Sequence, residues 1–263
     1  MGLTIHYNYA FDGSKQVLAE KLKYLKQRFS ELPIKKVHDL REINLCKQEF
    51  GYGKYNDERY YQNELGFNLQ HSFSPLKEKR DKLYKYIEKV GGTANLHKLT
   101  DQELSEYKNL EREVQDADKR LQKRILHSGN GYSLPVEVGD GCEWFEINIG
   151  RIGNADKWRG SSFTKTQYAQ DFVKSHLSVI TMLDLCKDTG ILNEVYDEGR
   201  YWETRDLKVL AEEINTSSLS IKALLEALRQ LAPEGCTVES KIDKSENYMV
   251  VDEQMESKKK KRF

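Results

Sequence analysis

The chain has 263 residues, and its 38% hydrophobic residues can supply a core for one large or two small domains. Its 42 Lys and Arg residues are balanced by 42 Asp and Glu residues, and this zero net charge disfavours a nucleic-acid partner. No apolar run is long enough to cross a bilayer, and the amino terminus lacks the basic start and apolar run of a secretory signal. We therefore expect a cytoplasmic protein without a membrane partner.

The amino-terminal segment has the clearest periodicity. Apolar and polar residues alternate over residues 3–9, which predicts a strand followed by a turn and a helix cap. The next apolar residues recur every three or four positions, which predicts a helix that ends before Pro33. Its buried stripe consists of Leu18, Leu22, Leu25, Phe29 and Leu32. We expect a second strand over residues 34–43 and an irregular segment from 47 to 74, with a short strand near 65–69.

Residues 75–128 are highly charged and predict two helices. A sparse apolar stripe is broken at residues 91–95, and Thr100 with Glu103 forms a capping box that opens the second helix. Apolar residues continue that helix to Ile125 at close to heptad spacing. The pattern predicts an antiparallel hairpin, which is a candidate partner surface, dimerisation element or lever. The simpler interpretation is a solvated insertion that packs on its own seam.

The second half of the chain resumes a strand-rich pattern. Residues 132–138 and 142–149 predict two antiparallel strands, and residues 169–187 predict an apolar helix. The remaining expected elements are a short strand at 192–196, a helix capped by Asp206, a helix at 219–231 and paired strands at 236–242 and 248–251.

These elements predict an α+β fold, a two-layer sheet-and-helix domain with an inserted antiparallel helical hairpin. The two halves of the domain are expected at residues 1–74 and 129–251. The hairpin occupies residues 75–128, and residues 252–263 are expected to form a charged flexible tail.

Unusual chemistry is concentrated in residues 158–168 and 197–206, on either side of the apolar helix. If that helix folds back, the two segments line one polar and aromatic cleft. Aromatic neighbours can desolvate a carboxylate and raise its pKa, and imidazole titrates near neutral pH. The predicted acid or base residues are therefore Glu203, Glu198 and His176. The alternative is structural, with carboxylates bound to backbone amides or to Arg200 and a histidine in the core.

A small anionic or nucleotide-like ligand is the expected occupant of this cleft. Lysine and arginine can hold a phosphate or carboxylate, and flat aromatic rings can stack on a base or sugar. The predicted ligand-binding residues are Lys165, Arg205, Thr164, Gln167, Tyr168, Tyr201 and Trp202. Surface ion pairing and core packing are the alternatives. The sequence carries no metal, nucleophile-elbow, phosphate-loop or dinucleotide motif, so we expect no metal and no cofactor.

Three strings in the sequence resemble those of a group of uncharacterised bacterial proteins of unknown function. They are residues 2–7, 162–169 and 197–206. The resemblance implies no reaction, cofactor or catalytic residue, but it directs attention to the same segments.

Two functions from different classes follow. The first is a protein that binds a small anionic ligand in the cleft, with hydrolase or transferase activity. The second is a non-catalytic interaction protein that uses the helical hairpin to recruit a partner. An open pocket that gathers Lys165, Glu198, Glu203 and Arg205 would favour the first function. Burial of these groups in mutual hydrogen bonds would favour the second.

Overall fold

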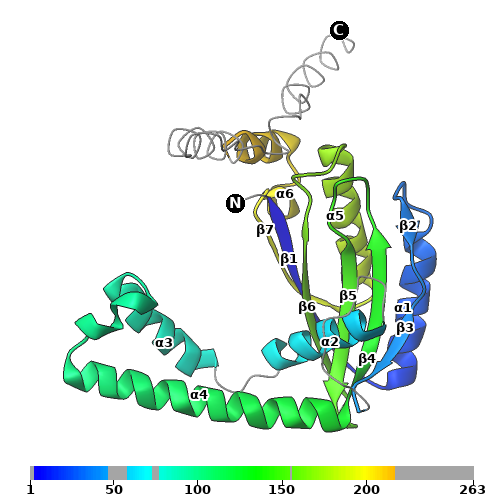
Figure 1. The fold of residues 1–263 in the computed structure, drawn as a ribbon. Helices are drawn as coiled ribbons and strands as arrows, with labels where there is room; N and C mark the ends of the chain where they lie inside the picture. Colours follow the sequence, from blue (N-terminus) through cyan, green and yellow to red (C-terminus); the bar gives the residue numbers. More distant parts are fainter. Residues whose placement is uncertain (1–2, 47–57, 73–76, 155, 217–263) are drawn as a thin grey trace, which may run out of the picture. The chain divides into compact units, whose positions relative to one another are not determined.

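A computed structural model describes residues 3–46, 58–72, 77–154 and 156–216 (Figure 1). The strands are β1 (Thr4–Asp12), β2 (Lys36–Val37), β3 (Arg41–Asn44), β4 (Gly129–Glu137), β5 (Phe145–Ile152), β6 (Lys157–Lys165) and β7 (Leu192–Asp197). The helices are α1 (Lys15–Phe29), α2 (Glu58–Ser72), α3 (Lys77–Val90), the 3-10 helix η1 (Thr93–Lys98), α4 (Asp101–Ser128), α5 (Phe172–Asp188) and α6 (Tyr201–Thr204). A further helical segment covers residues 207–216.

The strands form one seven-stranded sheet in which chain neighbours are not always spatial neighbours. Together with the helices, this sheet confirms the predicted α+β class. Its order is β2-β4-β5-β6-β1-β7, and β3 also pairs with β4. The β1–β7, β2–β4 and β5–β6 pairs are antiparallel, with Ile5 of β1 opposite Asp197 of β7 and Lys36 of β2 opposite Glu137 of β4. Packing divides the described residues into two compact units, residues 3–41, 133–148 and 161–216, and residues 42–46, 58–72, 77–132, 149–154 and 156–160. The predicted four-part division of the chain stays a prediction.

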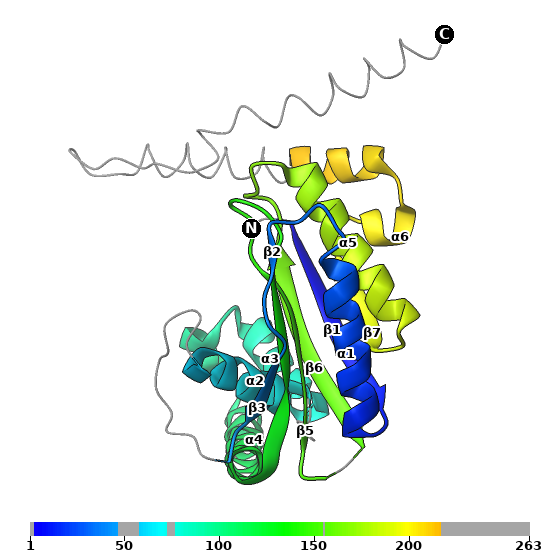
Figure 2. The ribbon, with the colours of Figure 1, turned by 90° about the vertical axis from the view of Figure 1, so that its right-hand side faces the viewer.

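The core of the first unit follows the predicted periodicities. Ile5, Tyr7 and Tyr9 of β1 are at most 1% exposed, and the predicted stripe of α1 is fully buried from Leu18 to Phe29. Both α1 and α5 lie on the same face of the sheet (Figure 2). Each fully buried leucine contributes about 1.5–3 kcal/mol to stability because it leaves water. The buried residues of β1 and α1 therefore stabilise the first unit.

The predicted strand at residues 34–43 is wrong as a single element. The structure has two short strands, β2 and β3, separated by residues 38–40, which belong to neither strand. The ladder between β2 and β4 ends before the next residue pair, His38 and Pro135, because proline has no N–H to donate. His38 still donates its backbone N–H to the Pro135 carbonyl, at 3.0 Å.

The expectation of an irregular segment with a strand near residues 65–69 is wrong over residues 58–72, and the rest of the segment from 47 to 74 lies outside the described residues. Residues 58–72 form the helix α2. Its buried residues Tyr61, Leu65 and Leu69 recur every four positions and form a single helical stripe. Interspersed Asn and Gly residues, which favour turns, concealed this stripe in the sequence.

The core cluster of the second unit joins α2 to β3 and to the carboxyl-terminal end of α4. Its members are Ile43, Leu45, Tyr61, Leu65, Leu69, Leu121 and Ile125. Position 131, beside this cluster, has room only for glycine. A Cβ atom on Gly131 would lie 2.5 Å from the Ile149 carbonyl oxygen and 2.8 Å from a methyl group of Leu65. The last turns of α4 are therefore part of the core of this unit.

Helices α3 and α4 run antiparallel, as a ladder of ion pairs shows. Lys79 pairs with Glu113, Lys82 with Glu106 and Lys89 with Glu103, and Arg80 holds both carboxylate oxygens of Asp118 at 2.6 Å. The predicted capping box of Thr100 and Glu103 is present at the start of α4. Hydrogen bonds from Lys89 and Thr100 lower the pKa of the Glu103 carboxyl to about 2.

The predicted helix at 219–231, the paired strands at 236–251 and the tail at 252–263 lie outside the described residues. Within the described ranges, no helix is both long and apolar enough to cross a lipid bilayer.

Candidate functional site

The predicted site residue His176 lies in the middle of a buried polar network in the first unit. Its ring Nδ1 is 3.0 Å from Thr166 Oγ1, and its Nε2 is 3.2 Å from Asp197 Oδ2. Helix α5 supplies the histidine, the segment after β6 supplies the threonine, and the last residue of β7 supplies the aspartate. His176 and Thr166 are 0% exposed and Asp197 is 2% exposed. The network therefore joins three elements, and its three side chains are almost completely buried.

The Asp197 carboxylate has three hydrogen-bond donors. Besides His176, the backbone N–H of Gly199 donates to Oδ1 at 2.8 Å, and that of Trp202 donates to Oδ2 at 2.9 Å. Burial raises the pKa of the Asp197 carboxyl, but the interactions with His176, Trp202 and Gly199 together lower it by more. The pKa therefore lies below its usual value, and the buried group is a charged acceptor.

The turn that brings these donors to Asp197 depends on the small size of Gly199 and on an unusual backbone angle at Arg200. A Cβ atom on Gly199 would lie 3.0 Å from His176 Cε1 and 2.7 Å from a methyl group of Leu210. Arg200 and Arg205, on either side of α6, have left-handed φ angles of 55° and 53°. Such angles cost a non-glycine residue about 1–2 kcal/mol, so surrounding contacts must stabilise them.

Two further predicted site residues hold the start of β1. Gln167 Oε1 accepts the Leu3 N–H at 2.9 Å, and Glu198 Oε2 accepts the Thr4 N–H at 2.8 Å. The backbone continues the same pairing, because Glu198 donates its N–H to the Thr4 carbonyl at 3.1 Å. These side chains satisfy backbone donors at the start of β1, where an unpaired buried N–H would cost about 1–3 kcal/mol.

Thr164 and Tyr201 point into the interior. The Thr164 hydroxyl is 2.9 Å from the Tyr7 hydroxyl, and burial raises the pKa of Tyr7. Tyr201 packs against a cluster that includes Leu3 and Phe172, with its ring 6.4 Å from that of His176. Neither side chain faces an open cleft.

Arg205 and Trp202 join α6 to α5. The Arg205 guanidinium donates to both carboxylate oxygens of Asp184, at 2.8 and 2.7 Å, and lies 4.7 Å from the Trp202 ring centroid. The hydrogen bond to Asp184 raises the pKa of Arg205. The ammonium of Lys165 lies 5.8 Å from the ring centroid of Tyr168, which is 37% exposed. The structure thus does not bring Lys165 and Arg205 together.

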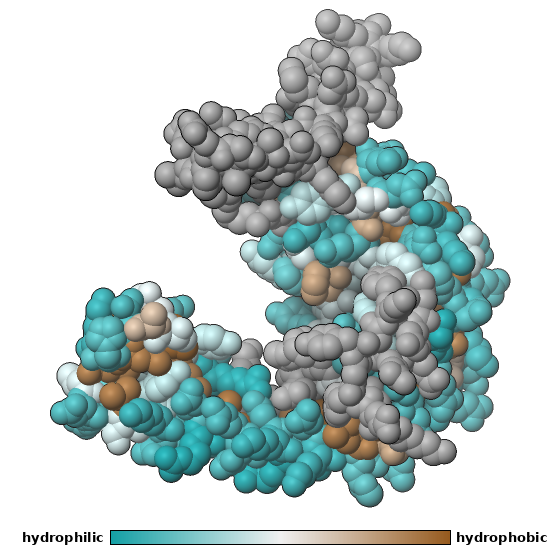
Figure 3. Space-filling view, in the orientation of Figure 1, coloured by the Kyte–Doolittle hydropathy of each residue, from teal (hydrophilic) through white to brown (hydrophobic). Residues whose placement is uncertain are grey.

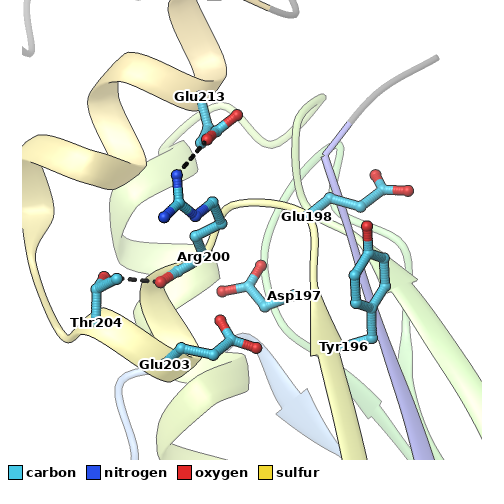
Figure 4. A pocket seen from close by; sticks show the side chains of 7 residues that line it. All are labelled: Tyr196, Asp197, Glu198, Arg200, Glu203, Thr204 and Glu213. Carbon is cyan, nitrogen blue, oxygen red and sulfur yellow. Dashed lines mark hydrogen bonds and ion pairs between the residues drawn. The ribbon is translucent and has the colours of Figure 1, made fainter.

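A pocket of about 440 Å³ lies at the end of β7 (Figure 4). It is lined by Tyr196, Asp197, Glu198, Arg200, Glu203, Thr204 and Glu213. Figure 4 shows the carboxylates of Asp197 and Glu203 turned toward each other, and Arg200 pairs with Glu213 at 3.4 Å. The pocket holds four carboxylates and one guanidinium, so negative charge is in excess. Among the described residues, no group of three or more His, Cys, Asp or Glu side chains is placed to hold a metal ion.

Of the ten predicted site residues, the pocket gathers Glu198 and Glu203. Sequence reasoning missed Asp197 and Thr166, which hold both ring nitrogens of His176. A usable signal was present, since an Asp two residues before a Gly at the end of a predicted strand often accepts a backbone N–H in a turn. Glu198 and Glu203 were predicted as acid or base residues instead, because aromatic residues adjoin them in sequence.

The chain matches no protein-family model, no curated protein and no solved structure.

Proposed function

We propose that the protein is a non-catalytic interaction protein that binds a partner protein through the hairpin of α3, η1 and α4. The observation that carries the proposal is the enclosure of His176, whose two ring nitrogens face Thr166 and Asp197. A general acid or base must come within hydrogen-bonding distance of its substrate. Thr164 and Gln167, both 0% exposed, likewise bond to the protein's own groups.

The surface of the hairpin supports a binding role. Apolar side chains gather on the face of the hairpin seen in Figure 3, over α3. In α3, Leu83, Ile87 and Val90 are only half-buried, and Tyr84 is 62% exposed. Contiguous apolar surface rimmed by charged residues is typical of protein-protein contacts, and exposed tyrosine is enriched at their energetic centres.

The alternative, a hydrolase or transferase for a small anionic or nucleotide-like ligand, has weaker support. The pocket beside β7 has an excess of negative charge, which repels an anion. Its one guanidinium, that of Arg200, is paired with Glu213.

A shortened hairpin tests the proposal. Because Arg80 and Asp118 join the two helices, a short Gly/Ser linker can replace residues 81–117 while Leu121 and Ile125 stay in their core cluster. A partner isolated by crosslinking to the full chain is purified, and its affinity for both chains is measured by calorimetry. We expect the shortened chain to lose at least about 100-fold in affinity.

A point variant sharpens the test, with a matched control. Tyr84→Ala should weaken binding of that partner about tenfold or more, whereas Tyr24→Ala on α1, where the tyrosine is 51% exposed, should leave it unchanged. Equal binding of the partner to the shortened chain would contradict the proposal. So would a small anion that native mass spectrometry finds bound to the freshly purified protein.

A further inference from the structure

Three aromatic side chains form a row on the sheet face that α1 and α5 leave uncovered. They are Phe163 of β6, His6 of β1 and Tyr196 of β7, called the aromatic row below. His6 lies directly opposite Tyr196 in the β1–β7 register, and its ring centroid is 6.0 Å from those of both neighbours. The alternate residues Ile5 and Tyr7 point to the other face and are buried.

The aromatic row is exposed to an unusual degree. Phe163 is 54% exposed and Tyr196 is 63% exposed, and the His6 side chain is 48% exposed. Large aromatic side chains at neighbouring positions of three strands offer a flat surface that packing among the described residues does not use. The row is therefore a candidate docking surface, separate from the hairpin.

The charges closest to His6 and Tyr196 are negative, and Lys165 lies two positions from Phe163 in β6. The Glu198 carboxylate is 3.6 Å from His6 Nε2, and Glu194 accepts a hydrogen bond from Asn8 at 3.1 Å. Tyr196 also lines the pocket that contains Glu203 and other carboxylates. Single-stranded nucleic acid stacks on such rows, but its phosphates would meet these carboxylates. A cation gains both from the carboxylates and from the negative faces of the rings.

We propose that the aromatic row and the adjoining pocket bind a basic peptide segment of a partner protein. An arginine side chain of that segment stacks on Tyr196 and directs its guanidinium to Glu198, which lies on the same side of β7 (Figure 4). Arginine suits this surface better than lysine, because its planar guanidinium stacks on rings and also binds a carboxylate through two hydrogen bonds.

The test uses the full chain and a fluorescently labelled octapeptide of alternating Gly and Arg, with binding followed by fluorescence anisotropy. We expect binding that weakens as salt is added, and no binding of a matched Gly–Glu octapeptide. Tyr196→Ala should weaken binding about fivefold or more, and Tyr196→Phe should retain it because the ring remains. Glu198→Gln should weaken it about threefold. Tyr24→Ala on α1 is the matched control and should have no effect.

Three outcomes would overturn the proposal. The first is equal binding of the Gly–Arg peptide to the chain and to its Tyr196→Ala variant. The second is tighter binding of a decathymidine oligonucleotide than of the peptide, lost in the Phe163→Ala and Tyr196→Ala variants, which would assign the row to nucleic acid. The third is peptide binding that appears only after the basic residues 258–262 are replaced by serine, which would assign the row to this chain's own basic run.

Discussion

Replacing His176 by alanine is expected to lower the free energy of unfolding by about 3 kcal/mol or more. The variant leaves the buried Asp197 carboxylate without its side-chain partner and opens a cavity between α5 and β7. Two backbone amides still bind the carboxylate, which places the loss near the lower end of the range for a broken buried pair. The measurement is urea unfolding followed by circular dichroism.

Two predicted site residues provide matched controls for this prediction. Glu203 is exposed and, within the described part of the chain, has no hydrogen bond or ion pair, so Glu203→Gln should change stability by less than about 0.5 kcal/mol. Arg205→Ala breaks a half-exposed pair with Asp184 and should cost about 1 kcal/mol. A loss for His176→Ala no larger than that for Glu203→Gln would contradict a structural role of the network.

Replacing Leu121 or Ile125 by alanine is expected to cost about 2–5 kcal/mol in each case. Both side chains are at most 5% exposed in the core cluster that also holds Leu65 of α2. The matched control is Leu104→Ala, near the other end of the same helix, where the leucine is only half-buried and the cost should be about 1 kcal/mol.

Hydrogen exchange locates the effect of these variants. The Leu121 and Ile125 variants should reduce amide protection in α2, whereas the Leu104 variant should leave it unchanged. Equal losses at all three sites would show that α4 unfolds as one piece with the core, and the shortened hairpin proposed above would then not fold.

The parts of the fold that could be predicted are those with an uninterrupted period. Alternation in β1 and the stripe from Leu18 to Phe29 depend on neighbours in sequence, and so does the capping box of Thr100 and Glu103. Strand β6 was missed because its buried positions include Gly160 and Thr164, which are not apolar side chains. Periodicity in hydropathy cannot reveal a strand whose buried residues are small or polar.

The candidate site could be predicted only as a set of segments. The pocket does gather Glu198 and Glu203, which are close in sequence. The partners of the remaining groups depend on tertiary contacts, as with Gln167 and Leu3, which lie 164 positions apart. Whether a carboxylate reacts or holds a backbone amide depends on burial and distance, and neither can be obtained from residue types alone.

The proposed non-catalytic function requires that His176 is enclosed in the fold and cannot meet a substrate. Acylation of histidines by diethyl pyrocarbonate, read by mass spectrometry of peptides, tests this claim directly. His97 and His127 are exposed and serve as internal controls. In the folded protein we expect both controls to be acylated and His176 to stay unmodified until urea unfolds the chain. Acylation of His176 in the folded protein at the rate of His97 would show an open site and contradict the account.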